Sequence, residues 1–349
     1  MREPRVQQPT SAHRGHTRPI DRLQSGLKNL INNAHSTGTK NTYNSGIKQY
    51  LLFCQFIGVL ALQFNDIHSR FPLFLVYLQQ EKELGYETIK VYAAAVRYWV
   101  VANGGPDPGR TLGGAVDPLY RILLQGIQRA AVGKIGNNRK PITLEKLIRF
   151  VGAIGNLQLP GLETARLRAL MLLSFWGLFR GSELCMKPGE QVFLRHRDIK
   201  VKHTKAGIAY LKITLRKTKT SQFKKTHAYI YSNQTGFCAV AAVLNFVKLK
   251  EIYLSFCQDS HIFSWPGAKM SVKYFNKLIK EVATLLGLKP RHYSSHCFRA
   301  GGATTATNRG VAPHIIKQMG RWTSNCFELY VKKPRVALFK AQKSLGYRH

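Results

Sequence analysis

Apolar residues recur at helical spacing through the first third of the chain. The first clear run occupies positions i, i+4, i+7, i+8 and i+11 of one helical face: Tyr43, Ile47, Tyr50, Leu51 and Cys54. Ser36 stands just before this run and is a typical helix cap. Residues 1–36 are rich in Arg, Gln, Pro, Thr and His and show no apolar periodicity, so we expect them to form a basic flexible arm.

Three more helices are expected before the pattern breaks. Their ranges are 72–84, 88–102 and 118–132. Pro72 opens the first of them and Gly85 closes it, while Asp117 caps the last. Because no strand pattern interrupts these helices, we predict a small all-α domain over residues 37–132. A stretch rich in Gly, Asn, Lys and Arg follows and predicts a linker over residues 133–141.

Beyond the linker, the spacing of apolar residues changes from a helical period to strict alternation and then back to a helical period. Helices are predicted at 143–155, 163–176, 238–250, 271–286, 294–309, 313–319 and 324–331. Strict alternation predicts strands at 208–215 and 226–231, with a basic hairpin turn between them. The expected fold is mainly α with a small antiparallel β-sheet. It divides into the helical domain and an α+β domain over residues 142–349.

The charge of the chain indicates its partner. Its 349 residues contain 53 Lys and Arg against 17 Asp and Glu, a formal net charge of +36. Such an excess attracts polyanions, and nucleic acid is the usual one. The hairpin region, residues 195–225, holds eleven Lys and Arg and one Asp, which favours phosphate contact. A membrane span and a secretory signal peptide are not expected, because no apolar run is long enough and the first thirty residues are charged throughout.

Several classes of chemistry lack the residues they need. The six cysteines are scattered without a C-x-x-C pair, and no H-E-x-x-H or D-x-D sequence occurs, so we expect buried reduced thiols and no metal site. P-loop and G-x-G-x-x-G sequences are also absent, which argues against nucleotide cofactors. We therefore expect a reaction that runs on Arg, His, Lys and Tyr without a cofactor.

Three short boxes carry those residue types. The first places Arg180 and Glu183 three residues apart after a strongly apolar helix. The second is His296-Cys297-Phe298-Arg299, which sets a histidine and an arginine on one helical face. The third is Gly320-Arg321-Trp322, followed by Tyr330, which lies 31 residues after Arg299.

In this order and spacing the boxes resemble the tyrosine recombinase (phage integrase-like) family. The sequence H-C-F-R-A-G-G-A-T, then M-G-R-W and L-Y-V, is most similar to the Crypton- and DIRS-type recombinases of eukaryotic mobile elements. The resemblance covers residues 37 to about 335. It implies that the helical domain is a core-binding domain that clamps DNA and that residues 142–349 form the catalytic domain.

The resemblance also implies a role for each residue. Tyr330 would attack a DNA phosphodiester and form a 3′-phosphotyrosine, while Arg180 and Arg299 neutralise charge on the non-bridging oxygens. His296 would accept or donate a proton. A lysine of the hairpin would protonate the leaving 5′ oxygen; we choose Lys219, with Lys217 as the alternative.

Two residues compete for the last site position. The family places a His or Trp directly after the glycine that precedes the tyrosine, and Arg321 fills that position here. We favour Trp322, one residue later, whose indole N–H could meet the phosphate. Glu183 is expected to orient its neighbours rather than to react.

The favoured function is a site-specific recombinase that integrates or excises a mobile element. The alternatives are a catalytically silent DNA-binding derivative and, less favoured, a topoisomerase. The family works as four protomers on two double-stranded DNA sites, so a homotetramer is expected. Residues 334–345 are expected to dock on a neighbouring protomer, and the alternative is that they pack on their own domain. A eukaryotic element implies the nucleus and a bacterial relative the cytoplasm.

Overall fold

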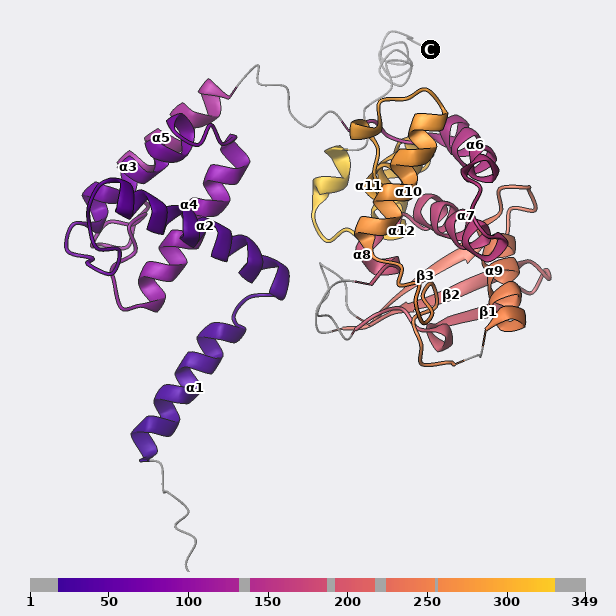
Figure 1. The fold of residues 1–349 in the computed structure, drawn as a ribbon, viewed down its shortest axis with the longest axis horizontal. Coiled ribbons are helices and arrows are strands. Elements are labelled where there is room, and N and C mark those ends of the chain that lie inside the picture. The colour runs from indigo at the N-terminus through magenta and orange to yellow at the C-terminus, as the bar shows by residue number, and fades with distance from the viewer. Residues whose placement is uncertain (1–17, 132–138, 187–191, 217–223, 255–256, 330–349) are drawn as a thin grey trace, which may run out of the picture. The chain divides into compact units, whose positions relative to one another are not determined.

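The computed structural model describes residues 18–131, 139–186, 192–216, 224–254 and 257–329. The chain divides into two compact units, Met1–Ile135 and Gly136–His349, each with its own core (Figure 1). The boundary falls inside the stretch that the sequence marks as a linker.

Unit 1 contains four helices that pack around an aromatic core. They are α2 (Thr37–Phe56), α3 (Ile67–Gln80), α4 (Tyr86–Ala102) and α5 (Pro118–Ala130). The predicted caps are present, because the Ser36 hydroxyl accepts the N–H of Thr39 and the Asp117 carboxylate accepts that of Tyr120. The core contains several aromatic side chains from α2 and α3, among them Tyr50, Phe53, Phe71 and Phe74, together with aliphatic residues of α3, α4 and α5.

The predicted start of α3 at Pro72 is wrong. The helix begins at Ile67, and Pro72 lies inside it. The extra turn is held by Arg70, a buried side chain that donates hydrogen bonds to the carbonyl oxygens of Leu60 and Gln63. These contacts with the preceding loop were not visible in a local pattern.

The predicted flexible arm also contains regular structure. Residues Pro19–Asn33 form helix α1, which begins with proline at its first turn. Four apolar side chains do recur along it at helical spacing: Ile20, Leu23, Leu27 and Leu30. All four are exposed, so nothing in the described part of the chain buries this stripe. The Tyr98 hydroxyl on α4 donates to the carbonyl oxygen of Ile31 at 2.7 Å and tethers the end of α1.

Unit 2 is a helical layer with one small sheet. Its α-helices are α6 (Leu144–Gly152), α7 (Gly161–Trp176), α8 (Gly181–Leu184), α9 (Ala239–Tyr253), α10 (Val272–Leu285), α11 (Ser295–Asn308) and α12 (Pro313–Met319). Short 3-10 helices are η1 (Ala153–Leu157), η2 (His196–Asp198), η3 (Pro290–His292) and η4 (Asn325–Leu329). Helix α7 is apolar nearly all round, as predicted, and packs between α9 and α11.

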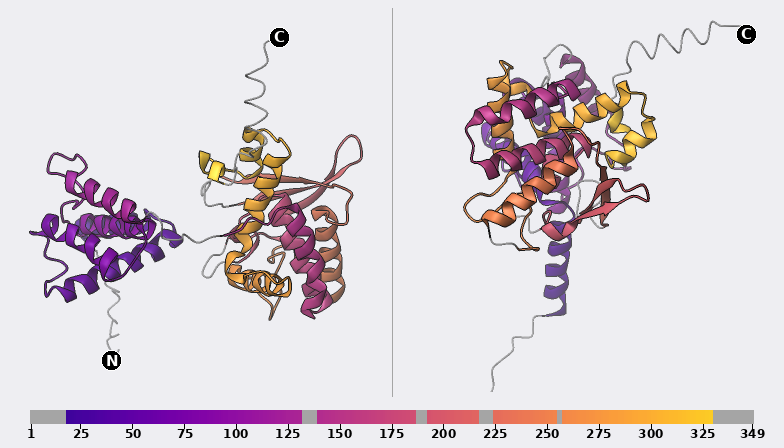
Figure 2. Two further views of the ribbon diagram at one scale, coloured as in Figure 1. Left: turned by 90° about the horizontal axis from the view of Figure 1, so that it is seen from above. Right: turned by 90° about the vertical axis from the view of Figure 1, so that its right-hand side faces the viewer.

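The sheet has three antiparallel strands in the order β1-β2-β3. They are β1 (Ile199–His203), β2 (Ala209–Leu215) and β3 (Thr226–Tyr231). The two predicted strands are confirmed. Strand β1 was missed because its five residues include only two apolar ones, Ile199 and Val201, too few for a clear alternating run. The inward residues of β2 and β3 pack toward α9, which lies against the sheet (Figure 2). The mainly helical fold with a small antiparallel sheet is therefore confirmed.

Two glycines allow α11 to lie close to its neighbours. A Cβ atom at Gly301 would overlap the carbonyl oxygen of Ile142, and one at Gly302 would overlap that of Phe175. The Ile142 N–H in turn donates to the carbonyl oxygen of Cys297. This close approach fixes α11, which carries His296 and Arg299, against the end of α7. No helix in the described ranges combines the length and apolar character needed to cross a bilayer.

Candidate active site

The first site box forms a tight turn at the end of α7. Leu178 has a left-handed backbone with φ of 46°, and Arg180 then caps the short helix α8. The Glu183 carboxylate accepts the backbone N–H of Arg180 and also its guanidinium Nη1, both at 2.9 Å. The predicted pair is thus a local unit, with the carboxylate buried and Arg180 16% exposed.

Arg299 joins this unit from α11. Its guanidinium is 1% exposed and lies 4.0 Å from the Glu183 carboxylate. It donates to the carbonyl oxygen of Leu178 and to that of Gly320, each at 2.5 Å. One side chain therefore connects the turn after α7 with the turn after α12.

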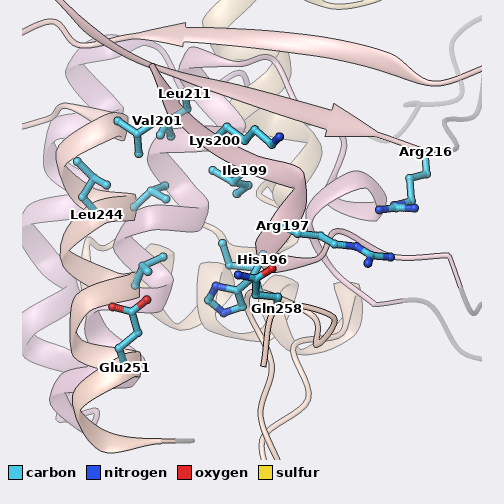
Figure 3. A pocket seen from close by; sticks show the side chains of 13 residues that line it. His196, Arg197, Ile199, Lys200, Val201, Leu211, Arg216, Leu244, Glu251 and Gln258 are labelled. Carbon is cyan, nitrogen blue, oxygen red and sulfur yellow. The ribbon is translucent and has the colours of Figure 1, made fainter. Parts of the chain in front are cut away.

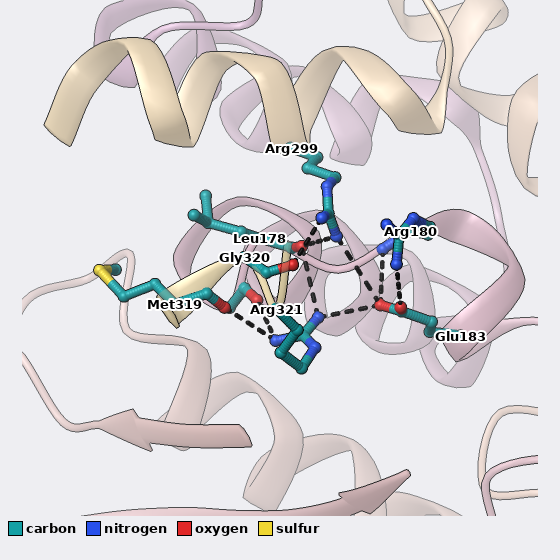
Figure 4. Close-up of polar contacts among 8 residues, drawn as sticks. Leu178, Arg180, Glu183, Arg299, Met319, Gly320 and Arg321 are labelled. Atoms are coloured by element: carbon teal, nitrogen blue, oxygen red, sulfur yellow. Dashed lines mark hydrogen bonds and ion pairs between the residues drawn. The ribbon is translucent and has the colours of Figure 1, made fainter. Parts of the chain in front are cut away.

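Arg321 is the third guanidinium at the same carboxylate. Its Nη2 lies 2.9 Å from Glu183, and its Nη1 donates to the carbonyl oxygens of Gly177 and Met319 at 3.0 and 2.9 Å. The backbone of Arg321 has a φ of 55°, in the left-handed region. Figure 4 shows Arg180, Arg299 and Arg321 converging on Glu183 from three different segments.

Aromatic rings cover two of these guanidinium groups. Trp322 is buried and lies with its ring centre 4.1 Å from the Arg299 guanidinium carbon. The ring centre of Phe179 lies 4.5 Å from the guanidinium carbon of Arg321. Both distances are those of cation–π contacts. Trp322 is therefore a direct neighbour of Arg299, whereas Arg321 points to Glu183 and the turn after α7.

The cluster holds an excess of positive charge. Burial disfavours the charged form of Glu183, but Arg321, the Arg180 N–H, Arg299 and the Arg180 guanidinium together outweigh it and lower its pKa. Burial lowers the pKa of Arg321 while Glu183 opposes that effect, and a guanidinium keeps its proton at neutral pH. One carboxylate thus faces three cations, an arrangement suited to binding an anion such as a phosphodiester.

Of the remaining predicted site residues, His296 lies in the part of the chain that the structure describes. His296 lies in the first turn of α11, one helical turn before Arg299. Lys219, Lys217, Tyr330 and the predicted docking segment 334–345 lie outside the described residues. The described chain ends at Leu329 in η4, whose Phe327 packs on Trp322.

Arg321 is the site residue whose contacts sequence reasoning missed. From the sequence, Arg321 was weighed only against Trp322 for the His/Trp position of the site. Its contacts could not be foreseen, because its partners lie about 140 positions earlier in the chain. The signal that could have found it is its place after Gly320, where a Cβ would overlap the Trp322 ring and a sharp turn is required.

Metal binding has no support in the part of the chain that the structure describes. No group of three or more His, Cys, Asp or Glu residues lies close enough there to hold an ion. The thiols of Cys54, Cys185, Cys238 and Cys297 are free and buried, and that of Cys257 is free and exposed.

A cavity of about 520 Å³ lies elsewhere in unit 2, between α9 and β1 (Figure 3). Its lining mixes apolar side chains with polar and charged ones, and the latter include Arg197 and Arg216. These two guanidinium groups already pair with Asp259 and Asp198, respectively. The cavity shares no residue with the arginine cluster, and we assign it no part in the site.

Comparison with solved structures shows which fold this is. The XerH site-specific recombinase bound to a palindromic difH substrate in a post-cleavage complex matches with a TM-score of 0.56 and 17% identity, covering 94% of this chain and 90% of that one. The Tn1549 transposon integrase in complex with transposon right-end DNA matches with a TM-score of 0.54 and 14% identity, covering 96% of each chain. A lambda integrase dimer bound to a COC′ core site matches with a TM-score of 0.53 and 14% identity, covering 89% of this chain and 76% of that one.

The fold is that of the tyrosine recombinases and integrases. No protein-family model matches the sequence, and no curated protein sequence does so either. The tyrosine recombinase fold is therefore established here by architecture. The arrangement of the arginine cluster is described from this chain alone.

Proposed function

We propose that the protein is a site-specific DNA recombinase or integrase that cuts and rejoins DNA through a 3′-phosphotyrosine intermediate. The observation that carries the proposal is the gathering of Arg180, Arg299 and Arg321 on one buried carboxylate, with His296 one turn from Arg299. The tyrosine recombinase fold supports it.

The arginines would act on the scissile phosphate. In the proposed reaction Arg180 and Arg299 donate to its non-bridging oxygens and neutralise the charge that grows in the pentavalent transition state. The Glu183 carboxylate accepts hydrogen bonds from both the backbone N–H and the guanidinium of Arg180, so the guanidinium is oriented before DNA binds. Removing one such donor costs about 3–4 kcal/mol in comparable sites.

Covalent chemistry is assigned to Tyr330. Its phenol oxygen would form a bond to phosphorus as the bond from phosphorus to the 5′ oxygen breaks. His296 is proposed to accept the phenol proton, and Lys219, or Lys217 in its place, to give a proton to the departing 5′ oxygen. The phosphotyrosine conserves the energy of the broken ester, so the reaction needs neither metal nor ATP.

For the last site position we retain Trp322. Its ring contact with Arg299 supports a place beside the phosphate, and its indole N–H would donate to a phosphate oxygen. Arg321, by contrast, is a positioning residue that holds Glu183.

The proposal extends to the biological setting. We assign the protein to integration or excision of a Crypton- or DIRS-type mobile element, acting on double-stranded DNA as a homotetramer on two sites with residues 334–345 docking on a neighbour. Its compartment would then be the nucleus.

A suicide-substrate assay tests the function. Nicked duplexes carrying the element's ends are incubated with protein in EDTA, and covalent protein–DNA bands are resolved on a denaturing gel. Wild type and the control Tyr293→Phe should form the band, and Tyr330→Phe should not. A band with Tyr330→Phe would refute the assignment of the nucleophile.

The alternative function is a DNA-binding protein that derives from such an enzyme and no longer cleaves. The basic hairpin region favours DNA binding under either proposal. Tight binding by wild type without any covalent band on every end sequence would select this alternative.

A further inference from the structure

One face of the sheet in unit 2 points away from the protein core. In β2 and β3 the side chains at alternate positions are buried, and those between them form the opposite face. The pairing register adds two residues of β1 to that face. We call it the outer sheet face, and its residues are Lys200, Lys202, Tyr210, Lys212, Thr214, His227, Tyr229 and Tyr231.

Aromatic rings form a continuous row across this face. Tyr210 lies 5.1 Å from Tyr231 and 6.2 Å from Tyr229, centre to centre, and His227 lies 6.5 Å from Tyr229. Tyr229 and Tyr231 are 50% and 56% exposed. Two phenol rings thus present accessible surface beside a third, which is the arrangement of a stacking platform.

The charges of the face are all of one sign. Lys200 on β1 stands directly opposite Lys212 on β2, and Lys202 stands opposite Tyr210. Like charges at directly opposed positions of a sheet destabilise it. Residues 199–231 contain nine Lys and Arg and no Asp or Glu, and no ion pair links the three lysines to any residue that the structure describes. A polyanion would offset this repulsion.

The combination of rings and lysines identifies the kind of polyanion. Duplex phosphates would use the lysines but leave the rings without a role, because the bases of a duplex are stacked on one another. An unpaired strand offers both phosphates and open base faces. The small platform of three β-strands resembles in its chemistry the sheets on which aromatic side chains stack unpaired bases.

We propose that the outer sheet face binds single-stranded DNA, with the phosphates on Lys200, Lys202 and Lys212 and two bases on Tyr229 and Tyr231. This interaction goes beyond the proposed cleavage reaction, since it involves none of the residues of the arginine cluster. It gives the protein a second nucleic-acid site, for strands that have left the duplex.

Binding of a single-stranded probe to the full chain tests the proposal. Fluorescence anisotropy with a 16-nucleotide oligo(dT) should give at least tenfold weaker binding for Tyr229→Thr combined with Tyr231→Thr, because each stacked base contributes about 1–3 kcal/mol. Threonine is a good strand former, so the sheet should persist. Binding of a 16-base-pair duplex by the same variant should stay within twofold of wild type.

A triple variant tests the charges separately. Lys200→Gln, Lys202→Gln and Lys212→Gln together should lower the slope of log affinity against log salt by about 2, since each phosphate contact of a single strand contributes about 0.7. The matched controls are Tyr253→Thr, an exposed tyrosine on α9, and the triple Lys273→Gln, Lys277→Gln and Lys280→Gln on α10. We expect Tyr253→Thr to bind oligo(dT) more tightly than the double tyrosine variant of the outer sheet face. The α10 lysine triple should likewise bind it more tightly than the lysine triple of that face.

Photocrosslinking makes the test independent of any variant. A 5-iodouracil oligonucleotide irradiated on wild-type protein should attach to Tyr229 or Tyr231, as located by peptide mass spectrometry. Attachment exclusively elsewhere, or oligo(dT) affinity that is unchanged in the tyrosine variant, would overturn the proposal. The probe contains no scissile site, so such a failure leaves the proposed cleavage function untouched.

Discussion

At the scale of single residues, the candidate site is organised by Glu183. This carboxylate receives two contacts from Arg180, three residues before it in the sequence, where Glu183 was expected to orient its neighbours. It also contacts Arg321, which no local pattern could indicate, because the two residues are 138 positions apart in the chain. Spacing within one turn of chain is readable from sequence, whereas contacts with the turn after α7 depend on how α11 and α12 pack.

This geometry predicts different effects for Arg321 and Trp322. Arg321→Ala removes one of the three guanidinium partners of Glu183 and the donor to Gly177, so the covalent-adduct rate should fall at least about a hundredfold through misplacement of Arg180. Arg321→Lys should restore part of the loss, because an ammonium keeps the charge but not the fork. Rates are measured by single-turnover adduct formation.

The comparison with Trp322→Phe separates positioning from contact with DNA. Phenylalanine keeps a ring on Arg299 but removes the indole N–H, so we expect a smaller loss of rate, about tenfold. Because Trp322 is buried, the smaller ring should also lower thermal stability modestly. An Arg321→Ala variant as active as wild type would contradict the positioning role.

At the scale of elements, the helices and two strands of unit 2 were readable because their apolar periods are strong. Strand β1 was not, because it is only five residues long, has two apolar residues and buries none of its side chains. Helix α1 was missed because its four apolar residues stand among polar ones and none is buried. Pattern reading thus finds elements that bury a face and fails for those that do not.

The close contact of α11 predicts a steep local cost. Gly301→Ala places a methyl group on the Ile142 carbonyl oxygen, so the free energy of unfolding should fall by about 3 kcal/mol or more, the upper end for overpacking. Gly152→Ala at the end of α6 meets nothing within 4 Å and should be neutral or slightly stabilising. Urea titration of both variants checks this, and equal stabilities would contradict it.

The loop before α10 predicts a pH dependence of stability. Burial lowers the pKa of His261 to about 4, as does the nearby positive charge of Lys250, and its neutral Nδ1 accepts the N–H of Phe263. The unfolded state, with an ordinary histidine pKa of about 6.5, therefore binds the proton first, so stability falls as pH drops from about 6.5 to about 4.

Replacement of this histidine isolates its contribution. His261→Gln should reduce that dependence by about 1.4 kcal/mol per pH unit, the value for one proton. Urea unfolding between pH 6.5 and 4.5 measures the slope, and the same titration at pH 8 gives the effect of the substitution alone. An identical slope in variant and wild type would count against the buried neutral state.

At the scale of the whole molecule, the two units have separate cores. A fragment of residues 136–349 contains every candidate site residue, so we expect it to fold cooperatively and to form the covalent adduct on the nicked duplex. Without unit 1 its affinity for that duplex should fall at least tenfold, because part of the positive charge is gone. Anisotropy and the adduct gel measure the two properties; an inactive but folded fragment would show that unit 1 contributes to catalysis.

The carbonyl contacts of Arg299 and Arg321 have a consequence for the order of synthesis. Both guanidinium groups come from late in the chain and bind the turn at Gly177 and Leu178, which is made much earlier. A nascent chain therefore has no assembled cluster until residue 321 has left the ribosome. A chain stopped before that point would keep most of its basic charge, but it would lack the assembled arginine cluster.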